Sequence, residues 1–260
     1  MKNVNSKKTN LLYFLFKIGY QFIDPFRLYS GITGYFWYIR DIFLFNKKSK
    51  TEKVKLDLDL FPILNEKIDF TPFDASYYYQ QLWAFGNILK NIPNEHVDIA
   101  SNYLFSGYVS KVTKSVFLDY RPIETSLKNL EIIKGDILHL PFANSSKASI
   151  SCLHVIEHIG LGRYGDEIDP DGVVKAVEEL QRVLEVNGRL YLSTPVGVPR
   201  LCFNAHRIFD PHQIVELFDE CKLINFSLVT DKGDFLENID ISLAKQQRYA
   251  CGMYVFEKLK

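Results

Sequence analysis

The residues with the clearest chemical potential are a histidine, a glutamate and a second histidine that lie close together. They are His154, Glu157 and His158, in the segment HVIEH. This i, i+3, i+4 spacing places all three side chains on one face if a helix begins there. A fourth candidate is His206, in the segment FNAHR. Imidazole and carboxylate groups in such numbers are typical ligands of a divalent metal ion.

A metal ion held by these four residues would have a definite chemical use. It would polarise a bound hydroxyl group, lower its pKa and orient it without a dedicated base. Three imidazoles and one carboxylate favour Mn, Fe, Co or Zn over Mg, which prefers oxygen ligands. We therefore predict that His154, Glu157, His158 and His206 are catalytic and bind a metal. The structural alternative is local pairing of Glu157 and His158, a half-buried His154, and a His206 that hydrogen-bonds a loop.

The loop that follows these residues, 160–172, is rich in Gly, Asp and Pro. One interpretation is a long connection held by Asp turns. The other is a loop that covers a substrate, because Arg163 can bind a phosphate or carboxylate and Tyr164 can stack on a sugar ring. We predict Arg163 and Tyr164 as substrate-binding residues, with Arg207 as a further candidate for an anion.

The elements that must position these residues follow from the pattern of apolar segments after Pro93. Short apolar segments alternate there with helical ones, which predicts βαβ crossovers and a parallel sheet. The segments predicted as strands are HVDIA, SVFLDY, LEIIKGDI, ASISCLHV and RLYLSTP. A helix is expected to end at Asn187-Gly188, and another to span residues 211–221. The final segments, LINFSLVTD and YACGMYVFEKL, are predicted to form an antiparallel edge pair.

The amino-terminal part has a different character. The segments LLYFLFKIGYQFI, at 11–23, and YFWYIRDIFLF, at 35–45, are predicted to form two aromatic-rich helices, separated by Asp24-Pro25 and by glycines at 31 and 34. Residues 46–55 are predicted to form a lysine-rich linker. This gives an extension at 1–60 and an α/β domain at 61–260. The aromatic helices either pack on the main domain or on a second copy, or they lie in a membrane interface. A helix after Phe73 should direct Tyr78, Leu82, Phe85 and Leu89 to one face and lead into the core.

Composition excludes several classes of function. Lys plus Arg and Asp plus Glu number 31 each, so no overall field attracts a polyanion, and nucleic acid is not an expected partner. The four cysteines lie far apart and form no CxxC pair, which is typical of buried thiols in a reducing cytoplasm. No apolar stretch is long enough to predict a membrane-spanning helix. We expect a cytoplasmic protein, with contact to the inner face of the membrane left open.

The order of elements resembles the fold of class I methyltransferases, with a mostly parallel Rossmann-like sheet. GDILHLPF, at 135–142, resembles the segment in which an Asp and its neighbour hold adenine, and Asp119 occupies the position of the acidic residue that binds ribose hydroxyls. ELQRVLEVNGRLYLSTP resembles the helix, turn and strand beyond the active site. The resemblance implies S-adenosylmethionine as cofactor. The residues that it implies for cofactor binding are Asp98, Ser101, Asp119, Asp136 and Ile137.

The first loop departs from that family. The family has an acidic residue followed by a glycine-rich run, whereas this chain has VDIASNYLF. Asp98 matches the acidic position, but Ala100, Asn102 and Leu104 stand where glycines are expected. Asn tolerates left-handed backbone, while Ala and Leu do so badly. A Rossmann-like domain that no longer binds the cofactor is therefore a second hypothesis.

At a finer level the chain resembles an uncharacterised methyltransferase-like family that carries HxxEHIGLGRYGD, DPxG and FNAHR. This sequence has HVIEHIGLGRYGDEIDPDG and FNAHR. The HVIEH segment is also similar to ExxEH in metal-dependent O-methyltransferases. The resemblance implies O-methylation of a sugar, a sugar nucleotide or another small phosphorylated or hydroxylated acceptor in surface-glycan synthesis. The competing hypothesis is a catalytically silent binding or scaffold protein that contacts a partner or a membrane.

Overall fold

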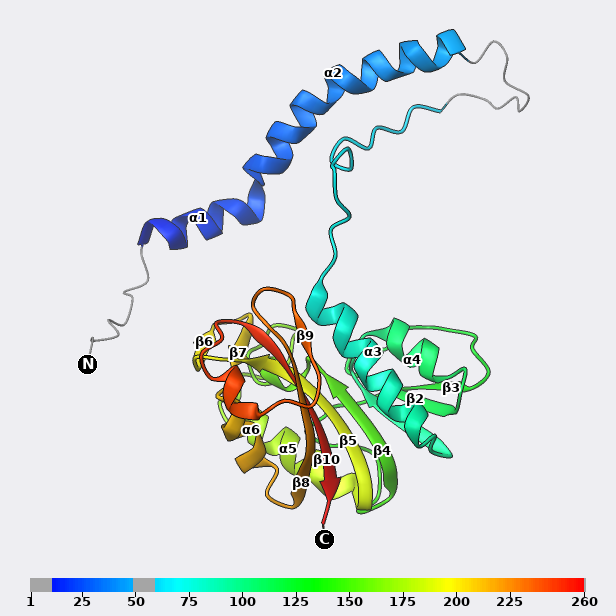
Figure 1. Ribbon diagram of the computed structural model, residues 1–260, viewed down its shortest axis with the longest axis vertical. Helices are drawn as coiled ribbons and strands as arrows, with labels where there is room; N and C mark the ends of the chain where they lie inside the picture. Colours follow the sequence, from blue (N-terminus) through cyan, green and yellow to red (C-terminus); the bar gives the residue numbers. More distant parts are fainter. Residues whose placement is uncertain (1–10, 49–58, 260) are drawn as a thin grey trace. The chain divides into compact units, whose positions relative to one another are not determined.

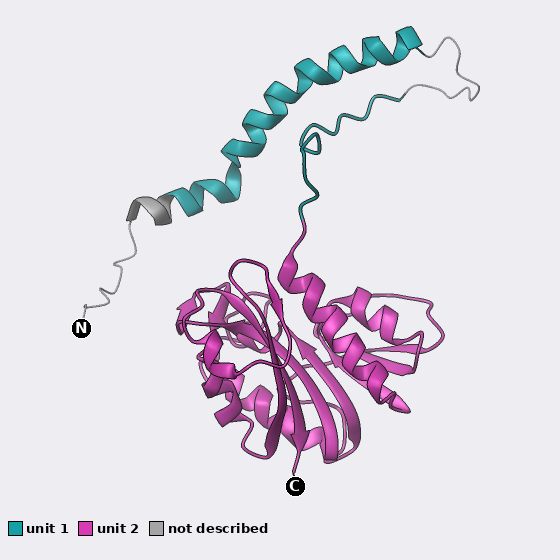
Figure 2. Cartoon of the chain, viewed as in Figure 1, with its two compact units in different colours: residues 1–72 teal, residues 73–260 magenta. Residues whose placement is uncertain are grey.

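The computed structural model describes residues 11–48 and 59–259. Contacts divide the chain into two compact units, residues 1–72 and 73–260 (Figure 2). The division predicted from the sequence, an extension at 1–60 and an α/β domain at 61–260, stays a prediction.

Unit 1 contains two helices, α1 (Leu11–Phe22) and α2 (Pro25–Lys48). The second begins at Pro25 rather than at the predicted Tyr35, because Gly31 and Gly34 lie within the helix and do not interrupt it. Asp24 separates them, and its Oδ1 accepts hydrogen bonds from the backbone N–H groups of Phe26 and Arg27, both at 3.0 Å. Pro25 follows at the first helical position, where its missing N–H has no cost. The expected linker begins later than predicted, because residues 46–48 still belong to α2, and the rest of it lies outside the described residues. No described helix is long and apolar enough to cross a membrane.

Unit 2 is built on an eight-stranded sheet in the order β3-β2-β1-β4-β5-β10-β8-β9 (Figure 1). The first five strands run parallel, while β10 pairs antiparallel with both β5 and β8. The strands are β1 (Glu95–Ile99), β2 (Lys114–Asp119), β3 (Leu130–Lys134), β4 (Lys147–Leu153), β5 (Leu184–Val196), β8 (Cys221–Val229), β9 (Phe235–Leu236) and β10 (Ala250–Lys258). This confirms the predicted Rossmann-like fold. The last two predicted segments, β8 and β10, pair antiparallel with each other at the antiparallel end of the sheet, where β10 joins β5.

Helices cover both faces of the sheet (Figure 1). On one face lie α3 (Ala75–Lys90) and α4 (Tyr103–Val109), and on the other α5 (Gly172–Val183) and α6 (Pro211–Leu217). The strands serve both layers because successive side chains point to opposite faces. In β10, Tyr254 and Phe256 join the α5 side, whereas Met253 and Val255 join the α3 side.

Three helix predictions are corrected. The helix expected to end at Asn187-Gly188 ends at Val183, and β5 begins at Leu184. The helix expected at 211–221 ends at Leu217. In α3 the predicted set Tyr78, Leu82, Phe85 and Leu89 does not form the buried face. The buried residues of α3 are Gln80, Trp83, Ala84 and Ile88.

Candidate functional site

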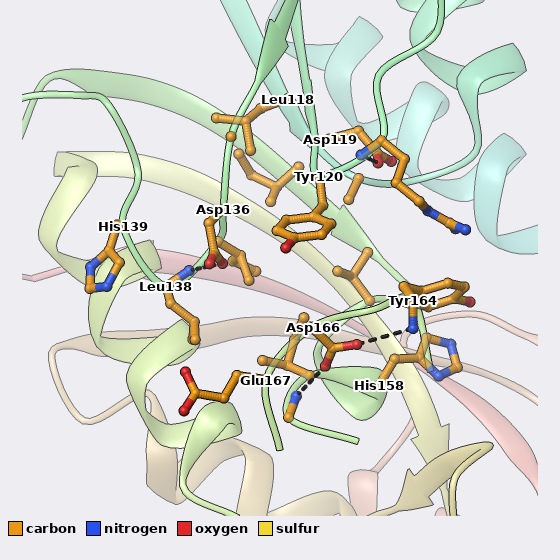
Figure 3. Close-up of a pocket in the computed structure, with 18 of the residues that line it drawn as sticks. Leu118, Asp119, Tyr120, Asp136, Leu138, His139, His158, Tyr164, Asp166 and Glu167 are labelled. Atoms are coloured by element: carbon orange, nitrogen blue, oxygen red, sulfur yellow. Dashed lines mark hydrogen bonds between the residues drawn. The ribbon is translucent and has the colours of Figure 1, made fainter. Parts of the chain in front are cut away.

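A cavity of about 380 Å³ opens at the carboxyl ends of the parallel strands (Figure 3). The strand order reverses between β1 and β4, and open α/β sheets bind ligands in the crevice at such a switch point. The size suits a small molecule or a cofactor. The cavity draws its lining from the ends of β1, β2 and β4, from residues 135–139 after β3, and from the loop that begins at Gly160.

Asp119 ends β2 and lines the cavity, where the sequence predicted a cofactor-binding carboxylate. Its Oδ1 accepts a hydrogen bond from the backbone N–H of Arg121 at 2.6 Å, which fixes the carboxylate at the strand end. The guanidinium of Arg121 lies over the ring of Tyr164, with its Cζ 4.4 Å from the ring centroid. This contact holds Tyr164, which belongs to the Gly-rich loop, beside the end of β2.

The segment after β3 forms a tight turn along the cavity. Asp136 and Ile137 both line it, as predicted, and Asp136 Oδ1 accepts from the N–H of Leu138 at 2.9 Å. Gly135 is needed at the start of this turn, because a Cβ there would lie 2.8 Å from Cδ1 of Leu118. The fixed turn presents Asp136 to the cavity (Figure 3).

The loop after β1 makes a sharp turn, although the glycines expected there are absent. Ala100 lines the cavity with φ at +52°, a left-handed conformation that strains a residue with a Cβ. Asn102 caps α4 by accepting from the N–H of Leu104 at 2.9 Å. Ser101 was predicted to bind cofactor, but its buried Oγ accepts from the N–H of Leu153 at 3.0 Å, outside the cavity lining.

Asp98, the other predicted cofactor residue in this loop, is fully buried in a polar cluster. Ser151 donates to its Oδ1 at 2.6 Å, and Ser106 donates to its Oδ2. Because Ser151 gives its proton to Asp98, its oxygen must accept from Nε2 of His96, 2.9 Å away. Ser149 donates to Nδ1 of His96 at 2.8 Å. Asp98 therefore belongs to a buried network between β1 and β4 and does not face the cavity.

Burial shifts both titrating groups of this network towards their neutral forms. It raises the pKa of Asp98 to about 6, although the hydroxyl groups around the carboxylate oppose the rise. It lowers the pKa of His96 to about 3. His96 is thus neutral at pH 7, which agrees with the hydrogen-bond directions.

The histidine and glutamate motif gathers around one buried carboxylate. Instead of the predicted helix, a single 3₁₀ turn, η2 (Ile156–His158), follows β4, and His154 takes φ at +56°. Glu157 Oε1 lies 3.0 Å from Nδ1 of His154 and 3.7 Å from Nε2 of His158. Neither carboxylate oxygen of the fully buried Glu157 accepts a hydrogen bond from any described residue.

His154 is held on both sides of its ring. Nε2 lies 3.2 Å from the Sγ of Cys251 on β10, while Nδ1 faces Glu157. The ring of Tyr77 on α3 lies against it, with the centroids 5.6 Å apart. Burial by itself lowers the pKa of His154, but Cys251 and Glu157 together raise it well above its ordinary value.

His158 has one nitrogen held and one without a close donor. Its Nδ1–H donates to the carbonyl of Ala205 at 2.7 Å, so in the neutral ring the lone pair is on Nε2. Burial lowers the pKa of His158 despite the nearby Glu157, and the ring is neutral at pH 7. His206 lies further off, with its ring centroid 6.4 Å from that of His158 and 4.9 Å from that of Tyr249.

The predicted metal site is not supported. Within residues 11–48 and 59–259, no group of three or more His, Cys, Asp or Glu side chains is arranged to hold a metal ion. The physical reason is that the ring nitrogens have other partners: both of His154, and Nδ1 of His158. Three of the four predicted residues, His154, Glu157 and His158, do come together, as a carboxylate between two imidazoles.

The loop after η2 combines both interpretations made from the sequence. Asp166 organises it by accepting from the backbone N–H groups of Gly160, Gly162 and Tyr164, at 3.0–3.2 Å. Tyr164, which is predicted to bind substrate, lines the cavity. Arg163 instead donates to the carbonyl of Ala205 at 2.9 Å. Arg207 likewise donates to the carbonyl of Ile159 at 2.7 Å, so neither arginine is among the cavity-lining residues.

Several site residues were not singled out from the sequence. Tyr77 and Cys251 both contact His154. They lie near the start and near the end of unit 2 in the sequence, so no local spacing links them to His154. Tyr120 and Glu167 line the cavity next to predicted residues. Their position directly after Asp119 and within the Gly-rich loop was the signal that could have found them. All four cysteines are free, and three of them are buried.

Solved structures with this fold include methyltransferases. The 1,6-didemethyltoxoflavin-N1-methyltransferase of Burkholderia thailandensis, with bound 1,6-didemethyltoxoflavin and S-adenosylhomocysteine, is 12% identical; the match covers 72% of this chain and 79% of that one, with a TM-score of 0.52. The N-methyltransferase NodS of Bradyrhizobium japonicum WM9, in complex with S-adenosylhomocysteine, is 11% identical over 74% and 90%, with a TM-score of 0.50. The cyclase SpnF is 9% identical over 69% and 81%, with a TM-score of 0.52. None of the curated proteins compared with the chain matches its sequence.

Unit 2 thus has the fold of class I S-adenosylmethionine-dependent methyltransferases. A family model described as "Caenorhabditis protein of unknown function, DUF268" matches residues 119–253, which is more than half of the chain. The chain belongs to this family. The matched region begins at Asp119 and includes His154, Glu157 and His158, the Gly-rich loop and the first four residues of β10.

Proposed function

We propose that this chain is an S-adenosylmethionine-dependent methyltransferase that methylates a hydroxyl group of a small acceptor, such as a sugar or a sugar nucleotide. The observation that carries the proposal is the cavity at the switch point of the sheet. Asp119 and Asp136 line it together with His154 and His158. Surface-glycan synthesis is the setting that the sequence resemblance implies.

The cavity residues fit the cofactor. Asp119 ends β2 with one carboxylate oxygen fixed by Arg121 N–H, and it would accept the two ribose hydroxyls. Asp136 and Ile137, on the fixed turn after Gly135, would hold adenine. Ala100 in its left-handed turn replaces the usual glycine at the first loop. S-adenosylmethionine, when bound, supplies an electrophilic methyl group on a positively charged sulfur.

His158 is the group best placed to take a proton from the acceptor. Its Nδ1–H is committed to Ala205, so Nε2 carries the lone pair, and the lowered pKa keeps the ring neutral. As the acceptor oxygen gains the methyl group, its hydroxyl proton would pass to Nε2 of His158. The resulting imidazolium would be stabilised by the carboxylate of Glu157, which lies 3.7 Å from Nε2.

The cavity favours an acceptor substrate that carries a hydroxyl group. Oε1 of Glu157 already pairs with Nδ1 of His154 at 3.0 Å, and the pKa of His154 is raised well above its ordinary value. Nε2 of His158, which lines the cavity, carries a lone pair without a close donor. A substrate hydroxyl that donates to this nitrogen would satisfy it and pass its proton to it. Tyr164 beside the cavity offers a ring on which a sugar can stack.

Calorimetric titration of the purified full chain with S-adenosylmethionine and S-adenosylhomocysteine tests the cofactor. We expect both to bind, and Asp119→Ala to weaken binding by about tenfold or more through loss of charge-assisted hydrogen bonds. Asp171→Ala is the matched control, because Asp171 is exposed and does not line the cavity. Equal affinity in Asp119→Ala and the control would remove Asp119 from the site.

A methyl-transfer assay then tests the acceptor class. Labelled S-adenosylmethionine is incubated with a panel of sugars and nucleotide sugars, and separately with a panel of amines. We expect an O-methyl product whose formation falls by about 100-fold or more in His158→Gln, while cofactor affinity is kept. Methylation of amines alone would overturn the hydroxyl acceptor.

The second candidate is a binding protein without catalysis, and the first loop favours it. Ala100 and Leu104 replace glycines that let backbone approach a cofactor, and Ala100 is strained. Failure of both ligands to bind in the titration would support this candidate.

A further inference from the structure

The surface of α2 in unit 1 has two different faces. Ser30, Gly34, Trp37 and Asp41 follow one another at helical spacing, and residues 64–67 cover them. Ser30 Oγ donates to Asn65 at 2.5 Å, and Asp41 pairs with Lys67 at 2.8 Å. Gly34 is the buried residue of α2, because a Cβ there would lie 2.8 Å from the Cβ of Leu64.

The opposite face of α2 is apolar and exposed. It runs through Leu28, Ile32, Phe36, Ile39 and Phe43, which also follow at intervals of three and four residues. All five are at least half exposed, and Phe36 and Phe43 are 77% and 71% exposed. No described residue of unit 1 covers this face. A row of this size on a soluble surface marks an interaction site.

The charge of this part of the chain indicates which kind of partner the apolar face of α2 binds. Residues 1–55 contain 11 Lys and Arg against 3 Asp and Glu, a net charge of +8, so the remaining residues carry −8. Within α2, Arg40 and the last-turn residues Lys47 and Lys48 accompany the apolar row. Two copies of a segment with charge +8 would repel each other, whereas an anionic lipid surface attracts such a segment and accepts aromatic side chains.

We propose that unit 1 binds the surface of an anionic lipid bilayer, with the Leu28–Phe43 face of α2 lying in the headgroup region (teal in Figure 2). Phe36 and Phe43 would insert between the headgroups, and the basic residues would lie near lipid phosphates. Tyr29 and Tyr35 of the same helix are exposed and belong to the residue types that favour membrane interfaces. This inference goes beyond methyl transfer and does not depend on it.

Co-sedimentation of the full chain with vesicles tests the proposal. The vesicles contain phosphatidylcholine with about one third phosphatidylserine, compared with phosphatidylcholine alone. We expect binding to the anionic vesicles that weakens with added salt, and much weaker binding to the neutral ones. Phe36→Ser with Phe43→Ser should lower the binding constant by about tenfold or more. The matched control is Leu201→Ser with Leu243→Ser, which removes two exposed side chains of unit 2.

The outcomes separate lipid from protein as the occupant. Thermal unfolding and circular dichroism establish that each variant is folded, and sedimentation equilibrium without lipid gives its oligomeric state. Equal vesicle binding by the Phe36/Phe43 variant and the control would overturn the proposal. A discrete dimer that the Phe36/Phe43 substitutions dissociate, without vesicle binding by the wild type, would assign the face to a second copy and also overturn it.

Discussion

At the scale of single residues, burial decides the role of each acidic side chain. Asp119 and Asp136 line the cavity, whereas Asp98 and Glu157 are fully buried. The two buried carboxylates differ in their partners. Asp98 accepts hydrogen bonds from serine hydroxyls, while Glu157 has only the imidazoles of His154 and His158 beside it. Asp98 is therefore part of a polar network in the core, whereas Glu157 pairs with His154 and His158, which line the cavity.

The pH dependence of unfolding tests the assignment of Asp98. Its pKa is about 6 in the folded chain against an ordinary value of 3.8, so its contribution is fully present below pH 3.8 and lost as pH rises through 6. Asp98→Asn removes this titration. The free energy of unfolding of the variant, relative to wild type, should rise by about 2 kcal/mol between pH 4 and pH 7. His96 titrates in both proteins and largely cancels. Urea unfolding across this range checks it, and a difference that stays constant with pH would contradict it.

At the scale of elements, the loop of residues 160–172 is a close-packed structure. Asp166 gathers three backbone N–H groups, and the backbone of Gly160 lies directly against that of Asp169. A Cβ on Gly160 would be 1.9 Å from the carbonyl oxygen of Asp169. This packing explains how a loop rich in glycine can still position Tyr164 at the cavity.

Two glycine substitutions separate backbone strain from steric conflict in this loop. Gly160 and Gly165 both have positive φ, but a Cβ on Gly165 would meet nothing within 4 Å. Gly165→Ala should cost about 1 kcal/mol from strain alone. Gly160→Ala should cost about 3 kcal/mol or more, because the backbone of the loop must move. Chemical denaturation measures both values, and equal losses would show that the contact with Asp169 is dispensable.

At the scale of the whole molecule, unit 2 has a core of its own. The buried hydrophobic side chains of the described chain begin at Trp83, and both core clusters lie within unit 2. A chain of residues 73–260 should therefore fold by itself, with a melting temperature within about 5 °C of the full chain. Circular dichroism and a cooperative thermal transition check this. Insoluble or molten material would show that unit 1 completes the core.

The sequence by itself determined the order of strands and helices, the parallel sheet and the positions of Asp119, Asp136 and Ile137 at the cavity. Hydrophobic periodicity is local, and it specifies an element and the strand end at which a residue lies. It also brought His154, Glu157 and His158 together, because they are neighbours in the chain.

Only the tertiary structure decided what those side chains face. Cys251 lies 97 residues from His154 and Ala205 lies 47 residues from His158, yet these partners occupy the ring nitrogens that a metal would need. The burial of Asp98 depends in the same way on Ser151 of the neighbouring strand. In α3 the apolar pattern permitted two faces, and packing on the sheet buried the one with Trp83 and Ile88. Hydrogen-bond partners and buried faces are set by segments distant in sequence, which local spacing does not encode.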